Sequence, residues 1–274
     1  MRTVNWLKLG NDMNQKENVI KGGVIIIGSL LWETKDNALA DGETLAQQRQ
    51  NWRNTNLNFR LQKEVDLPIT YGRTSSTRKC TYTMVFSSLF LNKLGKGLIV
   101  PYKEEFDFNT FSIFKNQGID LAKVEGISKS KEICCKNWGC IGIYINPDSI
   151  NSKKIKKYWD EFRLLDDNYL SIKAADYKFD RIKEDISLLN EDYTLKSDCL
   201  IQTALDFLFF TYIKPKHRNE KSETFPTSEE VAEEIKISGY DTYFRENKRN
   251  GILTFNDKEI DQYLTTKSVT KTSN

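Results

Sequence analysis

The sequence has one histidine, few prolines and no long apolar run, and each shortage excludes a class of protein. The single histidine, His217, excludes a metal site built on two histidines of this chain. Five prolines and 14 glycines in 274 residues exclude collagen-like and low-complexity chains. No segment approaches the roughly 18 apolar residues of a membrane-spanning helix, and the polar N-terminus does not resemble a signal peptide. We therefore expect a cytoplasmic protein with no membrane partner.

The cysteines do not form a disulfide framework, because their number is odd and two of the five are adjacent. Cys134, Cys135 and Cys140 lack the Cys-x-x-Cys spacing of zinc sites, and no second pair follows them. We interpret them as small buried side chains on a strand. His217 lies in the polar stretch 214–223, which we interpret as a solvated loop. We therefore expect no metal, no cofactor and no histidine-based mechanism.

The composition is that of a globular protein with a large core. Hydrophobic residues make up 39% of the chain, with 5 Trp, 12 Tyr and 15 Phe. The net charge of +3, from 41 basic and 38 acidic residues, neither requires nor excludes a nucleic-acid partner. Basic side chains without an intervening acid do gather in residues 71–103: Arg73, Arg78, Lys79, Lys93, Lys96 and Lys103.

The first part of the chain alternates between strand and helix patterns. Residues 24–27 form a β-branched run bounded by glycines, which predicts a buried strand followed by a sharp turn at Gly28. Similar patterns predict strands at 65–71, 80–87, 97–102 and 138–146, and helices at 39–53, 106–126 and 149–165. We expect an α+β fold for residues 1–165, a mixed α/β core domain with flanking helices.

From about residue 166 the pattern becomes mainly helical. The most apolar segment, 205–213, is interpreted as the end of a buried helix or as a strand, and a helix is predicted over 195–213. Thr227 and Glu230 have capping-box spacing and open a short helix, and a short strand is predicted at 252–255. We expect a mainly helical C-terminal region, 166–264, with a small capped-helix and strand module, and a disordered tail, 265–274.

The run VIIIGSLLW, residues 24–32, resembles the glycine-serine-leucine loop of gamma-glutamylcyclotransferase-like proteins. A second, weaker likeness covers the strand at 138–144 and the helix after it, which carries Glu161. The resemblance implies a mixed sheet or small barrel with flanking helices. It also implies that backbone groups of Gly28, Ser29 and Leu30 hold an amino-acid-like ligand. A carboxylate would then move a proton while the ligand's α-amine attacks its own γ-carbonyl.

Three carboxylates are candidates for this acid/base role. Glu161 follows the second likeness but does not fall at the family's helix spacing, Glu33 adjoins the loop, and Glu125 precedes Gly126. Burial would raise the pKa of any of them toward working pH. Ile27 stands where the family usually has tyrosine, which removes a hydroxyl. The sequence leaves the choice among the three open.

Residues 71–79, YGRTSSTRK, form a second candidate binding site. Arg73 and Arg78 offer planar donors, and the Ser and Thr hydroxyls between them could grip a phosphate or carboxylate. Arg49 and Arg53 share a helix face and would add charge. A nucleic-acid backbone, a nucleotide and an anionic peptide fit this pattern equally.

Three hypotheses for function follow. The first is a small-molecule enzyme or ligand-binding protein of gamma-glutamylcyclotransferase-like shape. The second is a binding module for phosphorylated or nucleic-acid ligands at Arg73 and Arg78. The third is a non-catalytic protein with a protein partner, in which Gly28 only turns a strand and Trp32 is a core aromatic.

Overall fold

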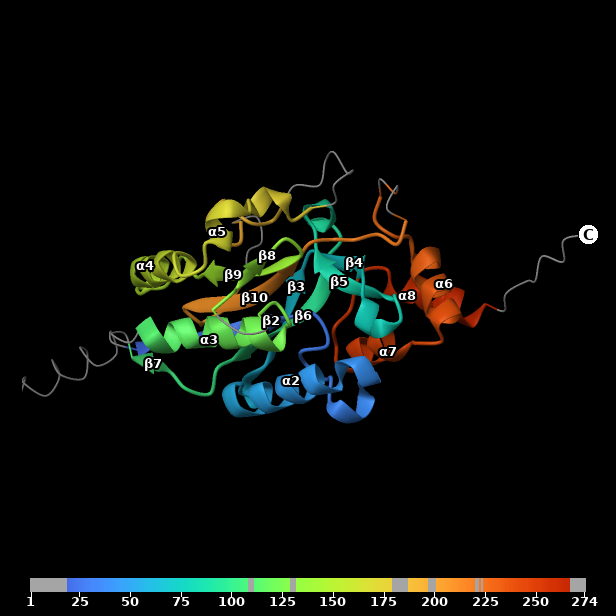
Figure 1. Cartoon of the computed structure of the whole chain (residues 1–274), viewed down its shortest axis with the longest axis horizontal. Helices are drawn as coiled ribbons and strands as arrows, with labels where there is room; N and C mark the ends of the chain where they lie inside the picture. Colours follow the sequence, from blue (N-terminus) through green and yellow to red (C-terminus); the bar gives the residue numbers. More distant parts are fainter. Residues whose placement is uncertain are drawn as a thin grey trace, which may run out of the picture.

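The fold is α+β, built on an open, mixed sheet of six strands (Figure 1). The computed structural model describes residues 19–107, 111–128, 132–178, 187–196, 201–219, 222 and 224–266. The strands, in spatial order, are β3 (Lys63–Leu67), β6 (Gly95–Pro101), β2 (Gly22–Ile26), β10 (Phe207–Ile213), β9 (Gly139–Ile145) and β8 (Cys135–Lys136). β2 and β10 are parallel, and the other neighbours are antiparallel.

Two short ribbons accompany the sheet. β4 (Ile69–Thr74) pairs with β5 (Tyr82–Phe86) as a hairpin, and β1 (Val19–Ile20) pairs with β7 (Phe106–Asp107). The hairpin is not hydrogen-bonded into the six-stranded sheet. The strands of the described residues therefore form no closed barrel, and of the two expected forms, mixed sheet or small barrel, the sheet is present.

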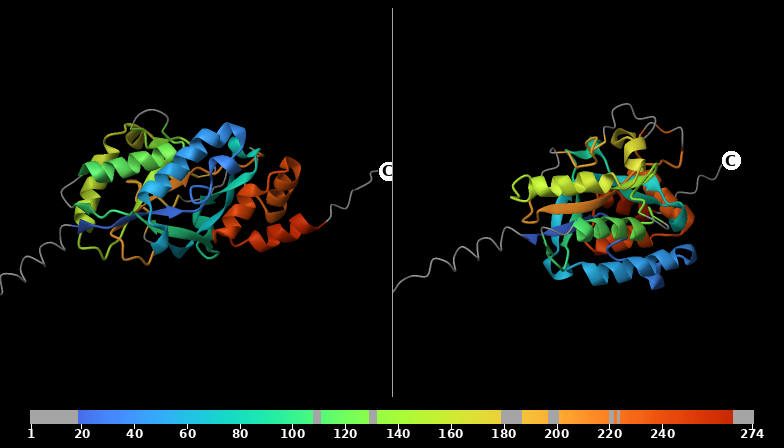
Figure 2. Two further views of the ribbon diagram at one scale, coloured as in Figure 1. Left: turned by 90° about the horizontal axis from the view of Figure 1, so that it is seen from below. Right: turned by 60° about the vertical axis from the view of Figure 1, so that its left-hand side comes forward.

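The helices lie around the sheet and at one end of it. They are α2 (Glu43–Asn56), α3 (Phe111–Val124), α4 (Ser152–Arg163), α5 (Asn168–Ser171), α6 (Ser228–Ser238), α7 (Thr242–Arg249) and α8 (Asp257–Thr265). Figure 2 shows α6, α7 and α8 gathered at one end of the molecule, beside the β4–β5 hairpin. Of the described helices, none is long and apolar enough to cross a membrane.

Other elements cover both faces of β10, and its side chains are apolar on both faces. Phe209 lies 4.9 Å from the ring of Phe114 on α3, measured between centroids. The alternate residue Tyr212 stacks on Phe86 of the hairpin at 5.7 Å. Side chains of a strand alternate between faces, so α3 covers one side of β10 and the hairpin the other. A strand buried on both faces shows no alternation of polar and apolar residues.

Residues 207–213, placed by the sequence analysis in the C-terminal region, thus lie at the centre of the sheet. Of the two interpretations of 205–213, helix end or strand, the strand is present, and the helix predicted over 195–213 is wrong at residues 207–213. β10 pairs with β2 and β9, both from the predicted core domain 1–165. One sheet therefore includes strands from both sides of the expected boundary.

The predicted capping box at the start of α6 is confirmed: the Thr227 hydroxyl accepts a hydrogen bond from the amide of Glu230. The strand predicted at 252–255 is wrong, because only Leu253 forms a bridge, with Lys96 of β6. The solvated-loop interpretation of His217 is also wrong, since its side chain is 6% exposed and lies beside Tyr82. Cys199 and most of the expected tail, residues 267–274, lie outside the described residues.

Candidate functional site

A cavity of about 780 Å³ lies where the first strand of the core ends, between the sheet and the β4–β5 hairpin. Its walls include Gly28, Ser29 and Leu30 after β2, and Arg73 and Arg78 from the hairpin and its loop. The two candidate binding segments of the sequence are therefore parts of one cavity. Its size is in the range of about 300–1,000 Å³ that is usual for small-molecule sites.

The chain turns sharply after β2, as Gly28 predicted. The amide of Leu31 donates to the carbonyl of Gly28 at 3.1 Å, and that of Glu33 donates to Ser29 at 2.9 Å. Within the described part of the chain, the amides of Ser29 and Leu30 donate no hydrogen bond. The first amides of a helical turn have no partner inside that turn, so these two N–H groups can serve a ligand oxygen.

Glycine is required at position 28 by a close approach. A Cβ atom there would lie 2.7 Å from the hydroxyl of Tyr243 on α7. This hydroxyl accepts a hydrogen bond from the amide of Met84 on β5 at 3.2 Å. Tyr243 also lies under Arg78, whose guanidinium carbon is 5.2 Å from the ring centroid. The C-terminal helices thus contribute a wall of the cavity.

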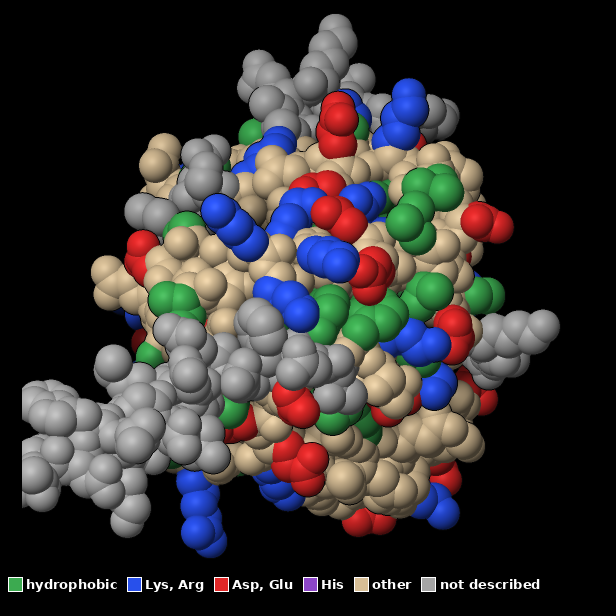
Figure 3. Space-filling view, turned by 90° about the vertical axis from the view of Figure 1, so that its left-hand side faces the viewer, with side chains coloured by type: hydrophobic (Ala, Val, Ile, Leu, Met, Phe, Trp, Pro, Cys, Tyr) green, Lys and Arg blue, Asp and Glu red, His purple; other side chains and the backbone are tan. Residues whose placement is uncertain are grey.

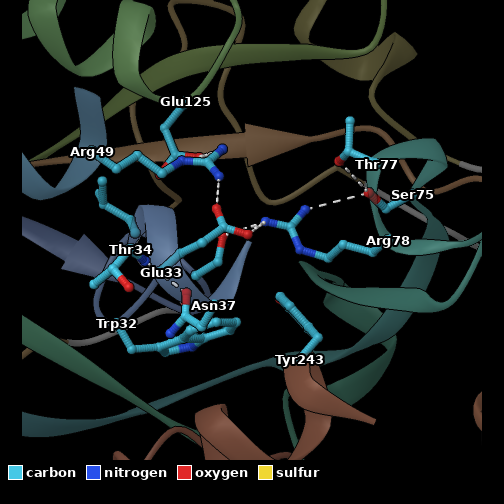
Figure 4. Close-up of polar contacts among 12 residues, drawn as sticks. Trp32, Glu33, Thr34, Asn37, Arg49, Ser75, Thr77, Arg78, Glu125 and Tyr243 are labelled. Atoms are coloured by element: carbon cyan, nitrogen blue, oxygen red, sulfur yellow. Dashed lines mark hydrogen bonds and ion pairs between the residues drawn. The ribbon is translucent and has the colours of Figure 1, made fainter. Parts of the chain in front are cut away.

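Glu33, at the end of the turn after β2, forms ion pairs with two arginines, Arg49 and Arg78 (Figure 4). One carboxylate oxygen accepts from Arg49, and the other accepts from Arg78 at 2.9 Å. Arg78 also donates to the Ser29 hydroxyl at 2.6 Å. All three charged side chains are buried, with residue exposures of 6% to 8%. A buried charge is stable only when it is paired and hydrogen-bonded, so Glu33 serves to place both arginines and does not itself line the cavity.

Glu125 faces the cavity from the end of α3. The helix stops because Gly126 adopts the left-handed conformation, with φ of 76°. The Glu125 side chain is 14% exposed, and its carboxylate is 3.8 Å from Arg49, which is too long for a hydrogen bond. Burial raises the pKa of Glu125, although Arg49 and Arg78 oppose the shift. Of the three candidate carboxylates, Glu125 alone lines the cavity.

Glu161 lies elsewhere. It is on α4, where its half-exposed side chain is 3.8 Å from Lys157 in the preceding turn. It is not among the residues around the cavity, and neither is His217. Groups of His, Cys, Asp and Glu that could hold a metal ion are absent from the described residues. The site therefore offers acid/base and anion-binding groups.

Tyr243 and the wall that α7 provides were not predicted from the sequence. Arg49 was expected only to add charge, whereas it lies between Glu33 and Glu125 and contacts both. The spacing of Arg49 and Arg53 correctly predicted that they share one face of the helix. Both are buried, and both contact Glu33 at the end of the turn. Arg53 donates to the carbonyl of Glu33 at 2.6 Å. For Tyr243 the sequence offered no signal.

Comparison of the chain with protein-family models, with curated proteins and with solved structures finds no match.

Proposed function

We propose that this protein binds an amino-acid-like, carboxylate-bearing ligand in the cavity and cleaves γ-glutamyl compounds by internal cyclisation, with Glu125 carrying the proton. One observation carries the proposal. Glu125 is nearly buried, has a raised pKa and lines the same cavity as the turn at Gly28–Leu30. A carboxyl group with a raised pKa and donors for a ligand oxygen therefore line one cavity, which supports a proton transfer to and from a ligand held there. The likeness of residues 24–32 to gamma-glutamylcyclotransferase-like proteins supports the same reaction.

The reaction needs no cofactor and no water. The ligand's neutral α-amino nitrogen forms a bond to its own γ-carbonyl carbon, and the bond from that carbon to the leaving nitrogen breaks. Glu125 accepts one proton from the attacking nitrogen and returns it to the leaving nitrogen. The products are 5-oxoproline and a free amine. A carboxylate with a raised pKa is the stronger base, which suits this transfer near neutral pH.

The chain supplies stabilisation for the charge that develops. The γ-carbonyl oxygen becomes negative as the nitrogen attacks, and the amides of Ser29 and Leu30 are available to it. Arg49 and Arg78 keep the surroundings positive, while Glu33 offsets part of their charge. Fixed donors of this kind need no rearrangement during the reaction, which is why they are effective.

A small ligand suits this site better than a nucleic acid. Arg78 is 8% exposed, so its guanidinium cannot lie against a phosphate backbone that passes over the surface. On the face that carries α4, basic and acidic side chains are interspersed (Figure 3). A nucleic-acid site usually gathers basic side chains into one stripe.

The experiment is to incubate the purified protein with γ-glutamyl dipeptides and to measure 5-oxoproline by mass spectrometry. We expect release that falls by about 100-fold or more in Glu125→Gln, the usual effect of losing a general acid/base. Glu161→Gln is the matched control, because that carboxylate is half-exposed on α4, and it should keep full activity. Absence of 5-oxoproline, or equal rates for Glu125→Gln and wild type, would contradict the proposal.

A further inference from the structure

Among the described cations that line the cavity, Arg73 is the one with no carboxylate partner. It lies on β4, half-buried, and its guanidinium carbon is 5.5 Å from the ring centroid of Trp138. One of its N–H groups donates to the carbonyl of Lys214 at 2.7 Å. Within the described part of the chain, no carboxylate pairs with it. An arginine carries five N–H donors, so most of its hydrogen-bonding capacity remains for another group.

The other cations around the cavity differ from Arg73 in this respect. Arg49 and Arg78 share the carboxylate of Glu33, and Lys123 lies 2.8 Å from Asp120. Burial lowers the pKa of Arg73, because partial removal from water destabilises the charged form of its side chain. A desolvated and unpaired charge is costly. An anionic ligand would remove this cost.

Four residues with hydroxyl side chains, Thr74, Ser75, Ser76 and Thr77, follow Arg73 along the chain and line the same cavity. Thr74 donates to the carbonyl of Lys216 at 3.5 Å, and the hydroxyls of Ser75 and Thr77 lie 3.2 Å apart. Ser76 and Thr77 are exposed, so this part of the cavity opens to solvent. Short hydroxyl donors beside a guanidinium are a common way to hold a carboxylate or a phosphate.

This anion site lies apart from Glu125. A row of contacts leads from Glu125 through Arg49 and Glu33 to Arg78, and Arg78 donates to the Ser75 hydroxyl at 3.3 Å. Figure 4 shows Ser75 and Thr77 on the far side of Arg78 from Glu125. A ligand that reaches both ends must therefore extend beyond the group that reacts at Glu125.

We propose that the cavity takes an elongated ligand whose second anionic group, a carboxylate or a phosphate, binds Arg73 and the hydroxyls of residues 74–77. This inference rests on the proposed function in that the ligand's reacting end lies at Glu125. It adds a specificity: the leaving part of the ligand carries a negative charge. Arg73 selects the ligand and takes no part in the proton transfer.

The test measures binding by calorimetry in Glu125→Gln protein, where turnover does not interfere. The probes are γ-glutamylglycine, its aminomethylphosphonate analogue, and γ-glutamylmethylamide, which lacks the second anion. We expect the two anionic probes to bind at least about tenfold more tightly than the neutral one. The advantage should vanish when Arg73→Gln is added. Arg60→Gln, an exposed arginine outside the cavity, is the matched control and should keep the advantage.

Equal affinity for the three probes, or an advantage that survives Arg73→Gln, would overturn the inference. If none of the three binds, the proposed function fails, and a titration with inorganic phosphate followed by phosphorus NMR then decides the inference. Line broadening that is lost in Arg73→Gln and kept in Arg60→Gln upholds the anion site. Broadening that is absent or independent of Arg73 overturns it. Unchanged melting temperature in Arg73→Gln shows that the variant is folded.

Discussion

The carboxylate of Glu33 accepts a hydrogen bond from Arg78 at 2.9 Å, across 45 residues of sequence. This contact joins the turn after β2 to the loop of the β4–β5 hairpin. Because Glu33 holds Arg49 with its other oxygen, one buried carboxylate fixes two arginines of the cavity. The geometry of the site therefore depends on a residue that does not line it.

Removal of the Glu33 charge should destabilise the fold. In Glu33→Gln two buried arginines lose their shared counter-charge, and breaking a buried ion pair on one side typically costs about 3–5 kcal/mol. We expect a loss near that range in the free energy of unfolding, measured in urea. The control variant Glu161→Gln, at a half-exposed position on α4, should change it by less than about 0.5 kcal/mol. Similar values for the two variants would show that the buried pair is not structural.

Gly28 and Tyr243 should be coupled energetically. In Gly28→Ala the new Cβ would meet the Tyr243 hydroxyl at 2.7 Å, whereas the ring carbon that bears this hydroxyl is 3.6 Å away. Tyr243→Phe removes the clashing oxygen and leaves the amide of Met84 without its acceptor. We expect each single variant to lose about 1 kcal/mol or more. The double variant should lose less than their sum by about 1 kcal/mol, and additive losses in thermal unfolding would contradict the contact.

Asp257 should give folding a pH dependence in the acid range. Burial raises its pKa from 3.8 to about 6, so between these values the folded state holds a proton that the unfolded chain has lost. Its contribution to stability is therefore fully present below pH 4 and is lost as the pH rises through 6. The shift corresponds to at most about 3 kcal/mol.

Asp257→Asn lacks this titration. Unfolding free energies of the variant and the wild type, measured between pH 4 and pH 7, should therefore diverge, with the wild type losing stability relative to the variant as the pH rises. Parallel curves would mean that Asp257 has an ordinary pKa. The variant keeps an oxygen that can accept the hydrogen bond that Thr254 donates from its amide.

The thiols should differ in reactivity as their burial differs. Cys80 is exposed, whereas Cys134, Cys135 and Cys140 are buried. Burial raises the pKa of the Cys135 thiol to about 11, and the thiolate is the reactive form. In Cys199→Ser protein we expect iodoacetamide to label Cys80 first and the other three only after unfolding. Early labelling of the buried thiols, read by peptide mass spectrometry, would contradict their position in the core.

The sequence predicted several local elements and left their assembly open. The β-branched run before Gly28 and the Thr227 capping box each carry their own signal, and both appear in the structure. The helix predicted over 195–213 is wrong at residues 207–213, because a strand buried on both faces has no period of two that would distinguish it from a buried helix. The place of this strand between β2 and β9 depends on pairing across long stretches of chain.

The parts of the candidate site could likewise be predicted from the sequence, whereas their assembly into one cavity could not. The segments at Gly28 and at 71–79 were visible as separate motifs, because each is continuous in sequence. Their union depends on packing of the hairpin on β10, through Phe86 and Tyr212, which no local pattern encodes. The choice of Glu125 over Glu161 likewise needed the fold, since the two differ in what surrounds them and not in residue type.

The proposed function depends on the turn after β2, whose backbone amides are proposed to bind a ligand oxygen. The most direct measurement is amide NMR of protein labelled with nitrogen-15 in glycine, serine and leucine, titrated with 5-oxoproline. We expect saturable shifts of the Gly28, Ser29 and Leu30 amide signals, with smaller changes at residues outside the cavity. Amide signals at these three positions that stay in place at saturating 5-oxoproline would contradict it.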